Sequence, residues 1–193
     1  MQDATTGPDA TLVAGLRAAQ PQAFDAVFAA FHGRVVGYLA RMLGRRDLAD
    51  DLAQEVFLRL ASAGTRLEPA TRLAPWLFTV AHHVLVSHLR AHRVRQQPAA
   101  ELAAQPIGAT SHGPFEALAA GHTQLRVERA LAALPAAQRE VVVLVALEGL
   151  STAEVARATA STEVAIRQRL SRARAAIAAA LVEHSPKGGP HDR

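Results

Sequence analysis

The segment from residue 151 to residue 182 constrains the fold more than any other part of the chain. It opens with Ser151-Thr152-Ala153-Glu154, the pattern of a capping box, in which the serine hydroxyl accepts from a free amide of the first helical turn and the glutamate reaches back to the cap. A helix is therefore predicted to begin at Thr152 and to bury Val155 and Ala158. The short turn 159–162 follows, with two further N-cap candidates, and then a second helix.

This second helix is predicted to have one buried and one polar face. The buried stripe recurs at spacings of four, three and four residues, and consists of Ile166, Leu170, Ala173 and Ile177. The opposite face and its flanks carry Val164, Arg167, Gln168, Arg169, Ser171, Arg172 and Arg174, and no acidic residue occurs in 164–182. A short helix, a tight turn and a second helix with an acid-free outer face indicate a helix-turn-helix, whose second helix enters the major groove of DNA. An ordinary helical hairpin would explain the stripe and the capping box, but not the absence of acids.

The rest of the chain also has helical patterning, so we predict an all-α fold. The apolar fraction is 50% but aromatic residues supply only 4%, which favours thin helical layers over a broad sheet core. A stripe at every fourth position contains Leu48, Leu52, Val56 and Leu60, and Asp47 is a plausible N-cap for its helix. A further helix is predicted to begin at Pro75 and to end among Arg90, Arg93 and Arg95.

Composition divides the chain into two small helical domains joined by a flexible linker. The first is predicted at 9–95 and the second, the helix-turn-helix domain, at 122–184. Between them, 96–121 is interrupted by prolines and glycines and is interpreted as the linker. The tail, 185–193, is predicted to be disordered.

The distribution of charge points to a polyanionic partner. The formal net charge is only +4, yet no acidic residue lies between Glu68 and Glu101 or between Glu163 and Glu183, while arginines populate both stretches. Two basic surfaces on separate helical units favour nucleic-acid binding. A pair of solvated helix faces is the alternative interpretation.

Enzymatic and metal-dependent functions find little support in the sequence. Gly149-Leu150-Ser151-Thr152-Ala153 lacks the final glycine of a nucleophile elbow, and its serine already serves as a helix cap. His88 and His92 have a spacing that could place two imidazoles on one metal, but no carboxylate lies nearby. We therefore predict no catalytic residue, no metal site and no cofactor.

The sequence also favours a cytoplasmic protein that does not insert into a membrane. It contains no cysteine, which excludes disulfides and fits a reducing compartment. The first residues lack a basic segment followed by an apolar one, so a secretory signal is not expected. The longest dense apolar run, 141–147, is far shorter than the roughly 20 residues that span a bilayer.

Taken in order along the chain, these features resemble the extracytoplasmic-function class of RNA polymerase sigma factors, over roughly residues 23–181. Asp50, Asp51, Gln54 and Glu55 form a polar, acidic patch that alone would be read as a solvated face. Within the stretch 50–60 they are similar to the family's polymerase-binding segment, which docks on the clamp helices of the β′ subunit. The resemblance implies core RNA polymerase, including its β subunit, as a partner.

The helix predicted from Pro75 resembles the family's reader of the minus-ten promoter element. The resemblance begins at Trp76-Leu77-Phe78-Thr79-Val80-Ala81 and ends at its basic turn. The residues that it implies in DNA contact are Trp76, His82, His83, Ser87, Arg90, Arg93 and Arg95. His83 and Ser87 stand where the family usually has asparagine and aspartate, so an unusual minus-ten preference is expected. Leu73 and Ala74 replace a common Phe-Arg pair.

The second unit resembles the family's reader of the minus-thirty-five element. The similarity rests on Leu134-Pro135, Arg139, Gly149-Leu150-Ser151, Glu154-Val155-Ala156 and 169–174. The DNA contacts that it implies are Thr162, Arg167, Gln168, Ser171, Arg172 and Arg174. Ala160 replaces the usual turn glycine, and a left-handed conformation there would cost about 1 kcal/mol.

The resemblance implies a sigma factor that binds core polymerase and promoter DNA and directs transcription initiation. It leaves open whether an anti-sigma factor binds the protein. The alternative is a helix-turn-helix regulator that recognises DNA without polymerase. Such a regulator would usually need a dimerisation or ligand-sensing domain, for which the first unit offers no obvious pocket.

Overall fold

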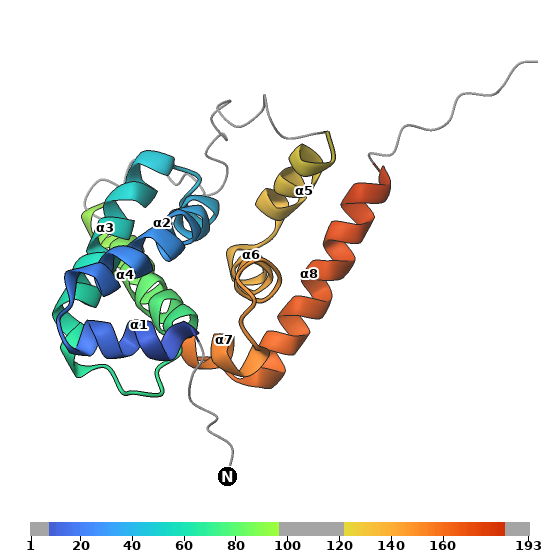
Figure 1. Cartoon of the computed structure of the whole chain (residues 1–193). Coiled ribbons are helices and arrows are strands. Elements are labelled where there is room, and N and C mark those ends of the chain that lie inside the picture. Colours follow the sequence, from blue (N-terminus) through green and yellow to red (C-terminus); the bar gives the residue numbers. More distant parts are fainter. Residues whose placement is uncertain (1–7, 97–121, 184–193) are drawn as a thin grey trace, which may run out of the picture.

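A computed structural model describes residues 8–96 and 122–183, and within these ranges the chain is helical, with no strand (Figure 1). The all-α prediction is therefore confirmed. The elements in order are α1 (Pro8–Arg17), α2 (Pro21–Leu43), α3 (Arg46–Ala63), the 3-10 turn η1 (Gly64–Arg66), α4 (Leu73–Gln96), α5 (His122–Ala133), α6 (Ala136–Val142), the π-turn η4 (Val143–Leu147), α7 (Thr152–Ala158) and α8 (Glu163–Glu183). Apart from Gln96, the predicted linker lies outside the described residues, as does the predicted tail.

The first unit, α1 to α4, is built around the predicted leucine stripe. Leu52, Val56 and Leu60 of α3 are buried, and Leu48 packs partly against the core. They meet α2 and α4, which supply the largest buried aromatic side chains, Tyr38 and Phe78. Burying one leucine or valine side chain contributes about 1.5–3 kcal/mol to stability. The stripe therefore fixes α3 against α2 and α4, and the opposite face of α3 is left on the surface.

Two helix starts differ from the sequence-based expectation. α4 begins at Leu73, two residues before Pro75, because the Leu73 N–H donates to the Asp9 carboxylate at 3.2 Å and so has a partner from α1. Asp47 is not the N-cap of α3, since Arg45 holds that position. Asp47 lies in the first turn instead, where the hydrogen bond from Arg45 holds its pKa below the ordinary value.

The second unit, α5 to α8, contains the predicted helix-turn-helix. Ser151 and Glu154 form a complete capping box at the start of α7, and Thr162 caps α8 by accepting from the Ala165 N–H at 3.2 Å. Ala160 adopts the left-handed conformation, with φ of 48°. The predicted stripe of α8 is buried at Ile166, Leu170 and Ala173 and partly buried at Ile177.

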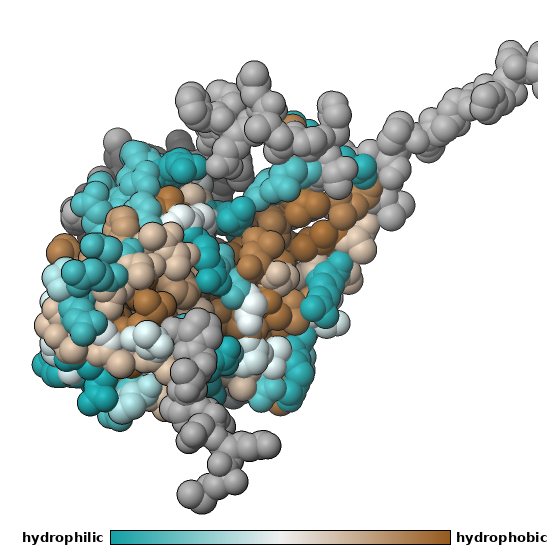
Figure 2. Space-filling view, viewed as in Figure 1, coloured by the Kyte–Doolittle hydropathy of each residue, from teal (hydrophilic) through white to brown (hydrophobic). Residues whose placement is uncertain are grey.

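The two units lie side by side in contact. α4 touches α7, α2 touches α6, and the buried apolar residues of both units form one cluster. Figure 2 shows apolar residues gathered where α6 lies against α5 and α8, and hydrophilic residues at the end of α8 nearest α7. This contact covers part of the surface of each unit.

Candidate polymerase and nucleic-acid interfaces

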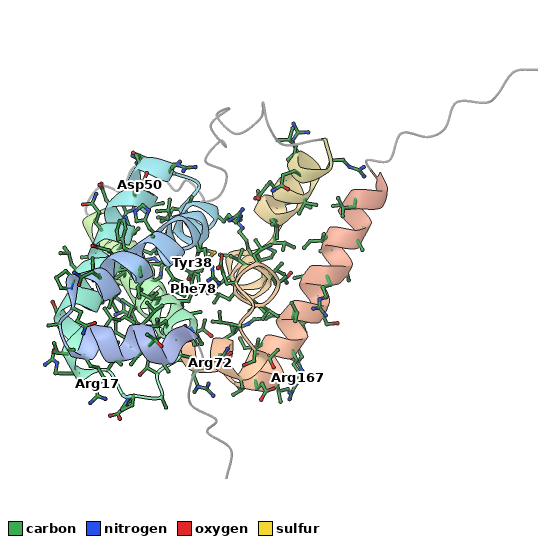
Figure 3. All side chains as sticks on the ribbon, in the orientation of Figure 1. Arg17, Tyr38, Asp50, Arg72, Phe78 and Arg167 are labelled. Atoms are coloured by element: carbon green, nitrogen blue, oxygen red, sulfur yellow. The ribbon has the colours of Figure 1, made fainter. Side chains whose placement is uncertain are left out.

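The acidic face of α3 lies on the surface, opposite the buried stripe. Asp51 and Gln54 are exposed, and Asp50 and Glu55 are half-buried. Glu55 forms an ion pair with Arg59 one turn further along. Figure 3 places Asp50 at the end of the first unit that lies far from Arg167 on α8. The structure thus brings the predicted polymerase-binding residues together on one helix.

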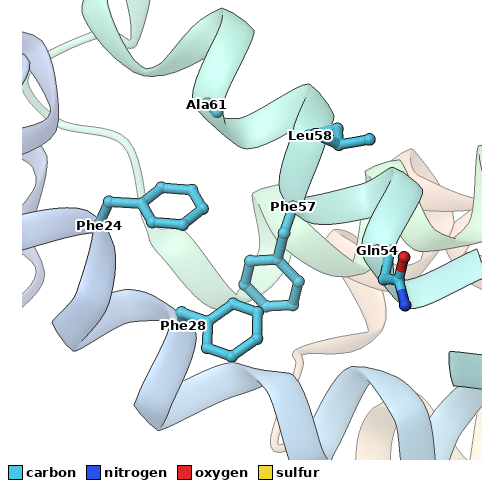
Figure 4. A pocket seen from close by; sticks show the side chains of 6 residues that line it. All are labelled: Phe24, Phe28, Gln54, Phe57, Leu58 and Ala61. Atoms are coloured by element: carbon cyan, nitrogen blue, oxygen red, sulfur yellow. The ribbon is translucent and has the colours of Figure 1, made fainter. Parts of the chain in front are cut away.

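An apolar groove continues this acidic face and was not predicted from the sequence. It is lined by Phe24, Phe28, Gln54, Phe57, Leu58 and Ala61, contributed by α2 and α3 (Figure 4). Leu58 is 68% exposed and Phe28 is 39% exposed. The Phe28 ring is stacked on His32, with ring centroids 4.6 Å apart, and meets Phe57 at 4.8 Å. The four-residue spacing of Phe24 and Phe28 is the signal that could have indicated this groove.

Most of the predicted minus-ten residues lie on the solvent side of α4. His83, Ser87, Arg90 and Arg93 are exposed, whereas Trp76 is half-buried and packs against the core. The side chain of Arg95 lies outside the described residues. An exposed basic end on a long helix is suited to hold a nucleic-acid backbone.

His82 is placed differently from its neighbours on α4. Its Nδ1 lies 2.7 Å from Glu140 Oε1 on α6, and its side chain is only 15% exposed. The structure therefore assigns His82 to the contact between the two units, and not to the exposed basic face.

The predicted minus-thirty-five residues share the outer face of α8. Gln168, Ser171, Arg172 and Arg174 are exposed. Thr162 is exposed as well, although its hydroxyl caps the helix. Arg167, also exposed, donates to Glu163 at 2.6 Å. No acidic residue follows Glu163 within the described part of this face, so it presents cations and an amide.

Comparisons with known proteins assign the family. Residues 27–95 match the family described as Sigma-70 region 2, and residues 124–177 match Sigma-70, region 4. The chain is 34% identical over 155 residues to the ECF RNA polymerase sigma factor EcfG of Rhodopseudomonas palustris, covering 77% of this chain and 80% of that one. It is 37% identical to the RNA polymerase sigma factor CarQ of Myxococcus xanthus, covering 69% and 74%. The chain belongs to the extracytoplasmic-function class of the sigma-70 family.

Solved structures agree with this assignment. CnrH, in complex with the cytosolic domain of CnrY, is 27% identical and superimposes with a TM-score of 0.62 over 92% of this sigma factor and 99% of that chain. RpoE of Bartonella quintana, in complex with the anti-sigma factor NepR, shares the fold, with 22% identity, a TM-score of 0.67 and coverage of 84% and 98%. A sigma factor directs polymerase to promoters and is not itself an enzyme. The alternative of a polymerase-independent regulator is not supported.

Between its two units this sigma factor has a polar contact that the sequence did not predict. The ion pairs are Arg34 with Glu148 at 2.9 Å, Arg41 with Glu128 at 2.8 Å, and Arg72 with Glu154. His82 Nδ1 lies within hydrogen-bond distance of Glu140 Oε1, at 2.7 Å. The Tyr38 hydroxyl also donates to Glu140 Oε1, at 2.6 Å. The partners are distant in the sequence, so no local pattern reveals them.

Burial perturbs two groups in this contact. The pKa of Tyr38 lies well above its ordinary value because the phenol is buried and faces the Glu140 carboxylate. Burial also raises the pKa of Glu148, although Arg34 and Arg41 act in the opposite direction. Both groups are thus removed from water where α2 meets the second unit.

Two further observations bear on other chemistry. The rings of His88 and His92 stack with centroids 6.3 Å apart, but no group of three or more His, Asp or Glu side chains within the described residues could hold a metal ion. None of the described helices is long and apolar enough to cross a membrane.

Proposed function

We propose that this sigma factor binds core RNA polymerase through α3, captures the minus-ten element through α4 and reads the minus-thirty-five element through α8. The single observation that supports the proposal is that three separate sets of surface side chains, of two chemical kinds, lie on three different helices. An acidic surface beside an apolar groove suits a protein partner, and two surfaces rich in arginine suit DNA.

The polymerase contact would combine the acidic face of α3 with the adjoining groove. Protein interfaces have an apolar centre and a polar rim, and aromatic residues are enriched in the centre. Here Phe28 and Leu58 would supply the centre, while Asp51 and Gln54 would supply the rim. Gln54 lines the groove as well, so the two surfaces are continuous. The expected occupant is the pair of β′ clamp helices, and the β subunit is proposed as a further contact.

The minus-ten contact would hold an unpaired promoter strand along α4. Proteins bind single strands by placing cations along the backbone and by stacking or pocketing bases. Arg90 and Arg93 would contact phosphates, while His83 and Ser87 would face bases. Because these two residues depart from the usual pair, this sigma factor should prefer an unusual minus-ten sequence.

The minus-thirty-five contact would place α8 in the major groove. Arginine can donate two hydrogen bonds to guanine and glutamine can pair with adenine, whereas phosphate contacts hold the register. Gln168 is the proposed base reader and Arg174 a proposed phosphate contact. The remaining exposed side chains of this face, Thr162, Arg167, Ser171 and Arg172, complete the set.

An anti-sigma factor is proposed as a further partner. The solved structures of CnrH and of Bartonella quintana RpoE contain CnrY and the anti-sigma factor NepR, respectively. A protein that works with polymerase on the chromosome acts in the cytoplasm, which is the proposed location. The proposed domains are 9–95 and 122–184, separated by the linker 96–121 and followed by the tail 185–193.

Transcription in vitro tests this function. Core polymerase would be mixed with the sigma factor and a library of promoter fragments, and the transcripts sequenced. We expect initiation from a discrete set of promoters that share two elements. Transcription that does not differ from that of core polymerase alone would contradict the proposal.

A further inference from the structure

The first turn of α8 carries an acidic side chain beside the surface proposed to read DNA. Glu163 is the first residue of α8, and its side chain is 42% exposed. The polar residues that follow within 164–174 are arginines, a glutamine and a serine. A carboxylate close to DNA repels the phosphates and so weakens binding to every promoter sequence. An acid at this place is therefore costly to DNA binding unless it also contributes to recognition.

The Glu163 carboxylate accepts two hydrogen bonds on one oxygen. Arg167, one turn further along α8, donates from Nη1 to Oε1 at 2.6 Å. Thr152, the first residue of α7, donates from its hydroxyl to the same Oε1 at 2.8 Å. The carboxylate is thus anchored to the other helix of the helix-turn-helix, and it holds the guanidinium of Arg167 to that anchor.

These hydrogen bonds contribute more to order than to stability. The Arg167 side chain is 57% exposed, and ion pairs between exposed side chains are weak because water screens them. A free arginine side chain samples many rotamers and loses this freedom when it binds a base, which lowers the affinity. A guanidinium that Glu163 already holds has lost part of this freedom before DNA binds.

Arg167 retains the donors that recognition of a base needs. A guanidinium has five N–H groups, and the bond to Glu163 uses one of them. The groups on Nε and Nη2 can still donate together to O6 and N7 of a guanine. Arg167 also lies near the end of α8 that is closest to α7 (Figure 3). The N-terminal residues of a recognition helix are those that contact base edges, so this position suits a base reader.

We propose that Glu163 is a positioning residue for promoter recognition: anchored by Thr152, it holds the Arg167 guanidinium in place to bind one guanine of the upstream element. This inference rests on the proposed assignment of α8 as the minus-thirty-five reader, and it adds Arg167 to Gln168 as a base reader. The Glu163 charge weakens binding to all sequences, whereas the ordered guanidinium favours only sequences with the guanine that it contacts. Glu163 therefore lowers affinity and raises selectivity.

The test is binding of the holoenzyme to promoter fragments that differ at single bases of the upstream element. The starting fragment is a promoter selected in the transcription experiment described above. Arg167→Ala should lose preference for guanine at one position, by about five- to 150-fold, the range of a bidentate contact. This loss identifies the position at which the other variants are compared.

The substitutions of Glu163 and Thr152 should alter preference at this same position. Glu163→Ala should reduce it by about two- to tenfold, the usual cost of ordering one long side chain. Fragments with a wrong base there should bind more tightly, because a repulsive charge is removed. Glu163→Gln keeps an oxygen that can accept from both donors, so it should retain part of the preference. Thr152→Val removes the anchoring hydroxyl and should reduce the preference by less than Glu163→Ala does.

A double variant and a distant acid provide the controls. Glu163→Ala combined with Arg167→Ala should have the same base preference as Arg167→Ala alone, because a positioning residue has no effect on preference once its partner is removed. Glu68→Ala, at an exposed position before α4, makes the same change in charge and should leave preference at the upstream element intact. Melting of each free variant, followed by circular dichroism, records its stability.

A purely structural role of Glu163 gives a different result. Glu163→Ala would then melt earlier and bind all fragments more weakly, with preference at the Arg167 position unchanged, and the inference would be overturned. An unchanged preference in Thr152→Val would overturn the anchor in α7. If Arg167→Ala changes no preference while Gln168→Ala does, the inference fails and α8 remains the recognition helix. If neither variant changes any preference, the proposed function of α8 fails as well.

Discussion

At the scale of single residues, the hydrogen bonds of Arg139 explain why an arginine stands one helical turn after the Leu134-Pro135 pair. Its guanidinium donates to the carbonyls of Leu131 at 3.1 Å, Ala132 at 2.7 Å and Leu134 at 3.0 Å, where α5 ends. It also donates to the Arg41 carbonyl of α2 at 2.9 Å. Burial lowers the pKa of this arginine. No lysine could replace this planar arrangement of donors.

Arg139→Lys should therefore destabilise the protein. The partly buried carbonyls of Ala132, Leu134 and Arg41 would lose this donor, whereas the Leu131 carbonyl still accepts from the Leu134 N–H. Because each unsatisfied group costs about 1–3 kcal/mol, we expect a loss of at least about 1 kcal/mol. Urea unfolding followed by circular dichroism measures it. Arg129→Lys, on the exposed side of α5, is the matched control and should change stability by under about 0.5 kcal/mol. Equal stability of the two variants would contradict this role of Arg139.

At the scale of elements, α7 depends on its capping box. Glu154 accepts from the Ser151 N–H and hydroxyl, both at 2.8 Å, and is paired with Arg72. Burial acts to raise the pKa of Glu154, but the bonds from Ser151 and the nearby arginines outweigh it, so the pKa is lowered. The carboxylate thus stabilises the fold above its unfolded pKa, and this contribution is lost as the pH falls through the folded pKa.

Glutamine can also complete a capping box, so Glu154→Gln removes the charge and not the cap. We expect the free energy of unfolding at pH 7 to fall by about 1 kcal/mol, the usual difference between hydrogen bonds to charged and to neutral groups. The difference from the parent should shrink as the pH is lowered below the unfolded pKa of glutamate, about 4.3. Urea unfolding at several pH values tests this. Glu68→Gln, an exposed position before α4, should show little effect at any pH. A difference for Glu154→Gln that does not depend on pH would contradict the argument.

The two proposed contacts on α8 should be separable by experiment. Gln168→Ala should relax preference at one upstream base, at a cost of about 1–3 kcal/mol for the preferred sequence. Arg174→Ala should weaken binding to all promoter sequences alike. It should also reduce, by about 0.9, the magnitude of the slope of the logarithm of the binding constant against the logarithm of the salt concentration. Holoenzyme binding to single-base promoter variants at several salt concentrations distinguishes them. If neither variant changes preference or slope, α8 is not the recognition helix.

The local structure of this chain could be predicted from sequence more fully than its contacts. The capping box at Ser151 and the stripe from Ile166 follow from short-range patterns of cap and periodicity. The left-handed Ala160 was indicated only by the resemblance, through the glycine that the family usually has there. The start of α4 could not be predicted, because it depends on Asp9 of α1. The groove beside α3 required knowing that α2 places Phe28 against Phe57.

At the scale of the whole molecule, the contact between the units could not be predicted. Arg34 and Glu148 are 114 residues apart, and each would be an ordinary solvated charge within its own unit. The sequence predicts which helices form and which of their faces are apolar, but pairing across such a separation depends on how the units dock. Because of this docking, His82 lies in the contact between the units, whereas His83, the next residue of α4, lies outside it.

In the proposed function, α3 joins this sigma factor to polymerase. Asp51→Arg combined with Gln54→Ala alters exposed side chains beside the buried stripe, so stability should change by under about 0.5 kcal/mol. Asp25→Arg, exposed on α2, introduces the same charge elsewhere and is the control.

The most direct measurement is the capture of core polymerase by the immobilised sigma factor, with melting of each variant recorded in parallel. We expect the double variant to melt like the parent and to capture no polymerase, while the parent and Asp25→Arg capture it equally. Capture of polymerase by the folded double variant at the level of the parent would show that this face of α3 is not the polymerase contact.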